Sequence, residues 1–491
     1  MSIQAFVDSA QRLARRNNLV LRAKAGRFLS LSTALCCLIP LLSAFPSAGA
    51  TDLVGVYHDA LIHDPLYREA RARYQAAQEA KPSAWAAFLP HIDASAGKSW
   101  DKSSGSSEQV ISDVNGALYA YNLSTLSHTS AKTWSINLSD TLFSWKDWMS
   151  LKRADKQVAE AQANYEAARE NLLARSATAY FGVLQRLDAL RAEKSAYAAL
   201  SYGLSEAKAA YSVGLTALIN VQQAEAARDR SAAVLIHDQR LLANAENRLQ
   251  TITGRTYASF KEPGSELPLI SPQPAKERYW VDLARRQNLH LIAKELALDA
   301  ARLRVRGSYG ADLPEVHLVA SRSYSNMISN QTVFGEEFRG LGSNENDAEI
   351  GLEVTVPLFD GGADRARTHK LQYEEDAASA SLTYAAREAR QGAEDAYLGV
   401  LGGIANVKAS KTALASNRTV FKAVQSGFKA GAESEMTVLD TLSNLMLAES
   451  QYSESRYSYL ESIFALKEAT GTLTPRTVFE VNRWLTRSIK P

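Results

Sequence analysis

The sequence predicts a mixed fold in which a membrane β-barrel is joined to a long α-helical barrel, and three observations predict it. Stretches of about nine residues alternate apolar and polar side chains, as strands with one apolar and one polar face do. Two segments, 147–211 and 363–429, contain no proline and repeat apolar residues at helical spacing. The chain also carries the same arrangement twice.

Residues 1–50 have the composition of a signal peptide. Basic residues precede an apolar core, FLSLSTALCCLIPLLSAF, and small residues follow it, which predicts cleavage before Thr51. A transmembrane anchor is the alternative, but Pro40 interrupts the core. Cys36 and Cys37 are the two cysteines of the chain, so the mature protein is expected to have no disulfide and no thiolate metal site.

Cleavage also changes the charge balance of the chain. The whole chain has 55 basic and 53 acidic residues, and about 49 and 52 of them remain after residues 1–50 are removed. The basic excess therefore belongs to the signal peptide, and nothing indicates a nucleic-acid-binding surface.

The mature chain divides into two similar units joined by a linker. We predict the first unit at 51–254, a proline-rich linker at 255–275, the second unit at 276–473 and a C-terminal tail at 474–491. Each unit is expected to run helix, strand, loop, strand, long helix, glycine turn, shorter helix. The shorter helices are predicted at 52–88, 221–253, 276–308 and 438–470, and loops rich in Ser, Asn and Gly at 101–131 and 325–347. Two shorter helices end to end equal one long helix, which fits a tube wall.

The duplication is clearest where a glycine turn enters a helix. The segments 213–254 and 430–471 align without a gap, so that Gly214 matches Gly431 and Thr253-Gly254 matches Thr470-Gly471. The repeat predicts the same turn and helix twice in each chain.

The alternation of the strands favours a membrane barrel over a sheet packed on a soluble core. In the segment 350–358, Ile350, Leu352 and Val354 alternate with polar or small residues, and the segment 134–142 behaves in the same way. Aromatic residues stand at both ends of the predicted strands, as the two aromatic girdles of a barrel do: Trp100, Trp134 and Tyr324 at one end, Phe143 and Phe359 at the other.

Four strands per chain cannot close a barrel. An open sheet edge in lipid leaves N–H and C=O groups without partners, and single-chain barrels begin at eight strands. Several chains must therefore share one barrel. Two chains would give eight strands around a filled interior, and three would give twelve around a channel.

Signatures of catalysis and of metal binding are missing from the sequence. The eight histidines show no metal-ligand spacing, and GGADRAR (361–367) lacks the spacing of a phosphate-binding loop. We therefore expect no enzymatic activity, no cofactor and no dedicated metal site.

Over about Thr51 to Leu473 the chain resembles the TolC-like outer-membrane efflux proteins. The resemblance depends on the order and spacing of VPLFDGG (356–362), AYSVGLTALINVQQAEA (210–226) and GFKAGAESEMTVLDTLSNLMLAE (427–449). It implies a homotrimer with a twelve-stranded barrel in the outer membrane and a helical barrel in the periplasm, encircled by a belt of small mixed structure. A periplasmic adaptor protein and an inner-membrane pump are expected to dock at the far tip.

Within that family the chain looks closest to the outer-membrane components of type I protein secretion. The segment HDPLYREARARYQAAQEAKPSAWAAFLPHI is similar to that branch, and no lipid-attachment cysteine is evident. An ABC exporter and an exported protein substrate are then the implied partners. Multidrug or metal efflux is the alternative in the same class. A trimeric coiled-coil tether or adhesin is the alternative in another class, and the duplicated strand pairs argue against it.

The resemblance also names residues at the tip of the helices. Asp440 matches the second of two aspartates that narrow the family's closed tip, and a ring of three such carboxylates would favour cations and could hold an inhibitory one. The first aspartate falls on Thr437, which cannot ionise. The positions of the family's bridging residues are occupied here by Phe428, Glu433 and Asn220.

Two glycines mark the expected tip turns. Gly214 and Gly431 are predicted to supply a tight backbone there. With Asn220 and Glu433, they mark the surface on which we expect the adaptor to dock. What holds this tip closed is left open, because most of the family's bridging set is replaced.

Overall fold

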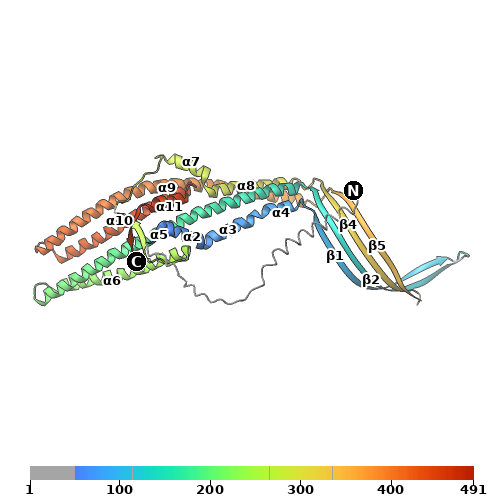
Figure 1. Ribbon diagram of the computed structural model, residues 1–491, viewed down its shortest axis with the longest axis horizontal. Helices are drawn as coiled ribbons and strands as arrows, with labels where there is room; N and C mark the ends of the chain where they lie inside the picture. The colour runs from blue at the N-terminus through green and yellow to red at the C-terminus, as the bar shows by residue number, and fades with distance from the viewer. Residues whose placement is uncertain (1–49, 113, 265, 334–335, 491) are drawn as a thin grey trace, which may run out of the picture. The chain divides into compact units, whose positions relative to one another are not determined.

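The computed structural model of the protein describes residues 50–112, 114–264, 266–333 and 336–490. The predicted signal peptide, except for Ala50, lies outside the described residues. The elements are α2 (Leu53–His63), α3 (Pro65–Gln78), α4 (Ala80–Ala86), β1 (His91–Ser112), β2 (Leu118–Phe143), α5 (Trp145–Ser212), α6 (Leu218–Thr253), β3 (Phe260–Pro263), α7 (Glu277–Gln287), α8 (Leu289–Ser308), β4 (Glu315–Val333), β5 (Glu336–Thr355), α9 (Ala363–Lys429), α10 (Glu435–Ala469), α11 (Pro475–Asn482) and β6 (Leu485–Ile489) (Figure 1). None of the described helices is both long and apolar enough to cross a lipid bilayer.

The two long helices are confirmed. Helix α5 has 68 residues and α9 has 67, so each is roughly 100 Å long at 1.5 Å per residue. Helix α5 begins directly after β2, where the side chain of Ser144 accepts a hydrogen bond from the backbone N–H of Asp147. Helix α9 begins after Gly361 and Gly362, both of which have positive φ angles.

Shorter helices lie along each long helix, as the helix lengths predict. Helix α5 contacts α3, α4 and α8 over one part of its length and α6 and α10 over the other (Figure 1). Ion pairs mark both parts: Lys156 meets Asp299 of α8 at 2.9 Å, and Lys208 meets Glu225 of α6 at 3.5 Å. Helix α9 contacts α7 and α8, and farther along its length α10.

Two of the predicted shorter helices are interrupted, so their predicted continuity was wrong. The segment 52–88 contains three helices, because Asp64 leaves the helical conformation and Pro65 starts a new helix. The segment 276–308 breaks at Asn288, whose side chain accepts a hydrogen bond from the N–H of Leu291 at 3.0 Å and so caps α8.

The main sheet is antiparallel, with strand order β1-β2-β4-β5. Its strands have 22, 26, 19 and 20 residues, so the loops predicted at 101–131 and 325–347 are mostly strand. The Ser, Asn and Gly content of these segments suggests loops, but their backbone groups pair with the neighbouring strand. In the hairpin of β1 and β2 the pairs run from His91–Ser139 to Ser112–Leu118. A long ladder of this kind satisfies the backbone whatever the side chains are.

The predicted position of three aromatic residues also changes. Trp100, Trp134 and Tyr324 lie inside long strands and not at strand ends. Trp134 and Tyr324 are direct cross-strand partners, and their rings stack with centroids 6.4 Å apart.

A small second sheet and the largest core lie beside the helices. Strand β3, within the segment predicted as a linker, pairs with β6, within the segment predicted as a tail. The buried Tyr180 of α5 donates a hydrogen bond of 2.6 Å to the carbonyl oxygen of Lys261 in β3. Around it the core gathers aromatic and aliphatic residues from α2, α5, α10, α11 and both strands, among them Phe181, Phe260 and Phe464.

Candidate functional site

The first tip turn connects α5 to α6 and contains Gly214. Its φ angle is +77°, in the left-handed region that glycine adopts most easily. The N–H of Gly214 donates to the carbonyl of Tyr211, and the N–H of Leu215 donates to the carbonyl of Ala210. These bonds close the end of α5 in the way that helix-terminating glycines do. Asn220 lies in the first turn of α6, where its amide donates to the hydroxyl of Thr216 at 2.8 Å.

The second tip turn connects α9 to α10 and has the same geometry. Gly431 has a φ angle of +75°, and the N–H of Ala432 donates to the carbonyl of Gly427 at 2.8 Å. Glu433 is exposed, and Phe428 is partly exposed. The two matching glycines therefore occupy matching backbone positions, as the duplicated sequence predicts.

Thr437 and Asp440, the two residues predicted to narrow the tip, lie in the first turns of α10. Thr437 takes part in the helix cap: its N–H donates to the hydroxyl of Ser434 at 3.2 Å, and the two hydroxyl groups are 2.9 Å apart. Asp440 is exposed and, within the part of the chain that the structure describes, makes no hydrogen bond or ion pair. It is therefore available to solvent and to ions.

The two turns lie at the same end of the helices (Figure 1). Near this end Glu206 of α5 lies close enough to Glu435, in the first turn of α10, to affect its ionisation. Burial raises the pKa of Glu435, and the neighbouring charge of Glu206 raises it further. The helical hairpins α5–α6 and α9–α10 thus present like charges to each other here.

Polar links between α5 and α10 occur farther from the turns. Asp188 of α5 accepts hydrogen bonds from the hydroxyl groups of Ser453 and Tyr457 of α10. Arg191 lies beside Asp188 and also bonds to Glu262 of β3 at 3.3 Å. This network connects α5, α10 and the small sheet.

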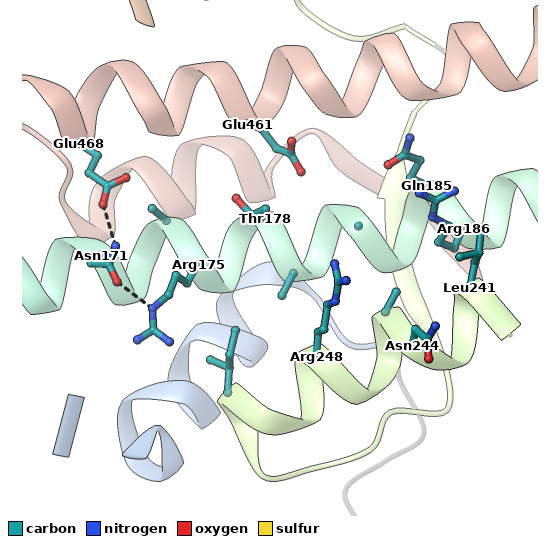
Figure 2. A pocket seen from close by; sticks show the side chains of 15 residues that line it. Asn171, Arg175, Thr178, Gln185, Arg186, Leu241, Asn244, Arg248, Glu461 and Glu468 are labelled. Atoms are coloured by element: carbon teal, nitrogen blue, oxygen red, sulfur yellow. Dashed lines mark hydrogen bonds between the residues drawn. The ribbon is translucent and has the colours of Figure 1, made fainter. Parts of the chain in front are cut away.

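A groove of about 560 Å³ lies among α5, α6 and α10 (Figure 2). Figure 2 shows Glu461 and Glu468 reaching from α10 toward α5, and Arg248 reaching from α6. Asn171 donates to Glu468 at 3.2 Å and accepts from Arg175 at 2.8 Å. Acidic residues on one wall thus face arginines on the others.

The groove opens on the side of α5 away from the small sheet. Thr178 and Gly182, which line it, are each two residues from Tyr180, and two residues turn a helix by about 200°. Tyr180 bonds to β3, so the groove lies on the opposite face of the helix.

Burial raises the pKa of several carboxyl groups in and beside this groove. It raises that of Glu461 to about 7. It raises that of Glu468 as well, although Asn171 and the charges of His290 and Arg175 oppose the shift. Burial, together with the neighbouring carboxylate of Glu468, raises the pKa of Glu170 to about 8. Carboxyl groups in low-dielectric surroundings retain their protons to higher pH.

This groove was not predicted from the sequence, although the spacing of its acidic residues is visible there. Asp440, Glu454, Glu461 and Glu468 stand at multiples of seven residues along α10. A seven-residue spacing keeps side chains on one face of a long helix. The tip aspartate and the groove carboxyl groups therefore belong to one acidic stripe.

The main sheet has two chemically different faces. Apart from two register shifts, after Thr141 in β2 and after Ser329 in β4, Cα partners pair odd with odd and even with even. Between these shifts the odd-numbered residues of all four strands share one face. The even face carries an apolar band from Val316 to Tyr324 on β4, about 27 Å tall at 3.3 Å per residue, in which Asp140 and Arg322 are the charged exceptions. The height matches the hydrocarbon band of a membrane barrel.

The odd face is acidic. In the paired registers of the described strands it carries no Lys or Arg, and its acidic residues are Asp93, Asp101, Glu315, Glu345, Asp347, Glu349, Glu353 and, beyond the register shift, Glu336, which pairs with Val333. No group of three or more His, Cys, Asp or Glu side chains in the described ranges could hold a metal ion. The odd face is therefore a polar, negatively charged surface.

Comparisons with known proteins agree with this arrangement of sheet and helices. The family model described as "Outer membrane efflux protein" matches residues 56–255 and 280–472. The outer membrane protein TolC of Vibrio cholerae serotype O1 is 28% identical over 438 residues, covering 89% of this chain and 94% of that protein. The alkaline protease secretion protein AprF of Pseudomonas aeruginosa is 25% identical and covers 88% and 87%.

Solved structures share the fold at lower sequence identity. The outer membrane channel CmeC of Campylobacter jejuni superposes with a TM-score of 0.69 at 17% identity, covering 93% of this chain and 97% of that one. The Vibrio cholerae outer membrane protein VceC gives 0.68 at 20% identity, covering 85% and 96%.

Proposed function

The chain belongs to the outer membrane efflux protein family, and from this premise we propose that three copies of it form the exit duct of a tripartite export system. It is an outer-membrane protein with its helices in the periplasm, and it is a transport protein rather than an enzyme. In the proposed assembly the even face of the sheet meets lipid. The odd face and the acidic stripe of α10 line the passage.

The observation that carries the proposal is that the main sheet has two edge strands. Strands β1 and β5 each have one edge without a partner among the described strands of the chain. An open edge in lipid costs several kcal/mol for each unpaired backbone group, so β1 of one copy is expected to pair with β5 of the next. Three copies give twelve strands, enough to enclose a channel, whereas two give eight around a filled interior.

Engineered cysteines test the closure. Ala94 of β1 and Ala348 of β5 lie on the even face, in the same row of the sheet. A chain carrying both Ala94→Cys and Ala348→Cys, with neighbouring β5 positions scanned for the register between copies, should form a disulfide-linked ladder that ends at three chains. The single variants should stop at dimers or monomers. A doubly substituted ladder that ends at two would reject the trimer.

We further propose that the cargo is a protein and that the system is type I secretion. Two relatives support this by name: the alkaline protease secretion protein AprF, and the proteases secretion protein PrtF of Dickeya chrysanthemi, which is 20% identical. Deleting the gene should remove a protein from the culture medium, and restoring it should return that protein. Unchanged secretion together with a gain in drug or metal sensitivity would favour the efflux alternative.

The two glycine turns are the proposed adaptor-docking surface. Gly214 with Asn220 and Gly431 with Glu433 stand at one end of the helices and are exposed or half-buried. Glu433→Lys should reduce adaptor cross-linking without changing the thermal midpoint, because the side chain is exposed. An exposed charge change on α3, Glu69→Lys, serves as the control.

A further inference from the structure

Two lysines face each other on the sheet just beyond the apolar band. Lys98 of β1 and Lys132 of β2 are direct Cα partners and lie on the even face, with the rest of the band. Their row is two residues, or about 7 Å, past the row of Trp134 and Tyr324. Like charges directly opposite each other on a sheet are destabilising, so this pair needs an explanation.

No acidic side chain on this face compensates the pair. Both lysines are exposed, and neither makes an ion pair with any described residue. The other two members of the row are Asn326 and Asn344. On the even face of β1 the nearest acidic residue to Lys98 is Glu108, ten residues away. On the even face of β2 the nearest to Lys132 is Asp140, eight residues away, so both are roughly 30 Å distant.

The rows next to the lysine pair contain an aromatic residue and further basic residues. The ammonium group of Lys98 lies 4.5 Å from the ring centroid of Trp100, which is 72% exposed on the same face. Lys102 and His128 form another cross-strand pair two rows farther along. An aromatic residue with its apolar body and polar tip, beside unpaired cations, is typical of the boundary between hydrocarbon and headgroups.

We infer that Lys98 and Lys132 bind the phosphate group of an outer-leaflet lipid. The helices leave the sheet at the opposite border of the apolar band and lie in the periplasm, so the lysine row faces the outer leaflet. A lipid phosphate between the two ammonium groups turns their repulsion into two charge-assisted contacts. The inference rests on the proposed orientation, in which the even face meets lipid, but not on the channel being conductive.

Lipid binding by the purified full-length protein tests the inference. Diphosphorylated lipid A is added to the detergent-solubilised protein, and retained lipid is counted by native mass spectrometry. Lys98→Gln with Lys132→Gln should weaken binding by roughly thirtyfold, because each lysine contributes about five- to sixfold near an anionic surface. Lys98→Arg with Lys132→Arg should bind within about threefold of the unmodified protein.

The matched control removes two charges elsewhere. Lys194→Gln with Lys429→Gln changes two exposed lysines on α5 and α9 and should leave lipid binding unaltered. Equal binding by the Lys98/Lys132 glutamine variant and the unmodified protein would overturn the inference. Displacement of the lipid by inorganic phosphate at equal phosphorus concentration would also overturn it, because the site would then recognise phosphate and not a lipid. Single-channel conductance, measured separately, reports on the duct alone.

Discussion

The carboxylate of Asp188 on α5 accepts a hydrogen bond of 2.8 Å from the hydroxyl group of Tyr457 on α10. Tyr457 is almost fully buried, and Ser453 donates a second bond to the same carboxylate. Close to the tip, Glu206 of α5 lies near enough to Glu435 of α10 to raise the pKa of that carboxyl group. The two hairpins are therefore held together at Asp188 and repel each other at their ends.

Removing the carboxylate of Asp188 should weaken the packing of α5 against α10. Asp188→Ala leaves the hydroxyl of Tyr457 buried without a partner, which costs about 2 kcal/mol of unfolding free energy. Thermal unfolding and hydrogen exchange of α10 report the loss. Glu69→Ala breaks an exposed pair with Arg73 and should cost less than about 0.5 kcal/mol. Equal effects of the two variants would contradict a special role for Asp188.

The sequence predicted the helices well because their signal is local. A segment such as 363–429 has no proline and an unbroken apolar spacing, and the structure has one helix, α9, over the same residues. The breaks at Pro65 and Asn288 were also visible locally, as a proline after aspartate and as an asparagine at a helix start. The apolar spacing nevertheless continues across both breaks, and this spacing favours one unbroken helix in each segment.

The sheet and the groove were harder to predict because they depend on distant partners. The segment 101–131 has a loop composition, but its two halves pair with each other as a hairpin, and part of its second half also pairs with β4, about 200 residues away. Strands β3 and β6 are more than 200 residues apart in the chain, so neither predicts the other. Glu461 carries a visible seven-residue spacing, but its burial depends on α5 and α6.

Two glycines with similar backbone angles should tolerate alanine differently. Gly431 has a φ angle of +75° with open space around its Cβ position, so Gly431→Ala should cost about 1 kcal/mol through the backbone alone. Gly471 has a φ angle of +68°, and a Cβ there would lie 2.0 Å from the carbonyl oxygen of Gln287. Gly471→Ala should therefore cost about 3 kcal/mol or more. Similar thermal midpoints for the two variants would refute the difference.

The stability of the protein should depend on the ionisation of Glu461. Burial raises its pKa in the folded state to about 7, above the ordinary value of 4.5. The folded state thus binds this proton more tightly than the unfolded state. The contribution of Glu461 to stability falls as the pH rises from 4.5 to 7 and is constant above that.

Glu461→Gln tests this dependence. The variant should be more stable than the unmodified protein at pH 8, by about 1 kcal/mol once solvent screening is allowed for, and equal to it near pH 4.5. Arg175, Arg186 and Arg248 line the same groove. Glu454→Gln alters an exposed residue of the same stripe and should change the stability by less than about 0.5 kcal/mol at both pH values. Denaturation curves at the two pH values provide the comparison.

Asp440 should determine how divalent cations affect conductance through the proposed duct. In a trimer, three exposed carboxylates around the symmetry axis attract cations, and Thr437 adds no charge because its hydroxyl does not ionise. Millimolar Mg²⁺ or Ca²⁺ should reduce single-channel current in planar bilayers. Asp440→Asn should raise the blocking concentration by about tenfold or more, because it removes the charge and keeps the shape. Asp395→Asn, at an exposed position of α9, should leave the block unchanged. A block of undiminished strength in the Asp440 variant would place the cation elsewhere, with Glu454 the next candidate on the same stripe.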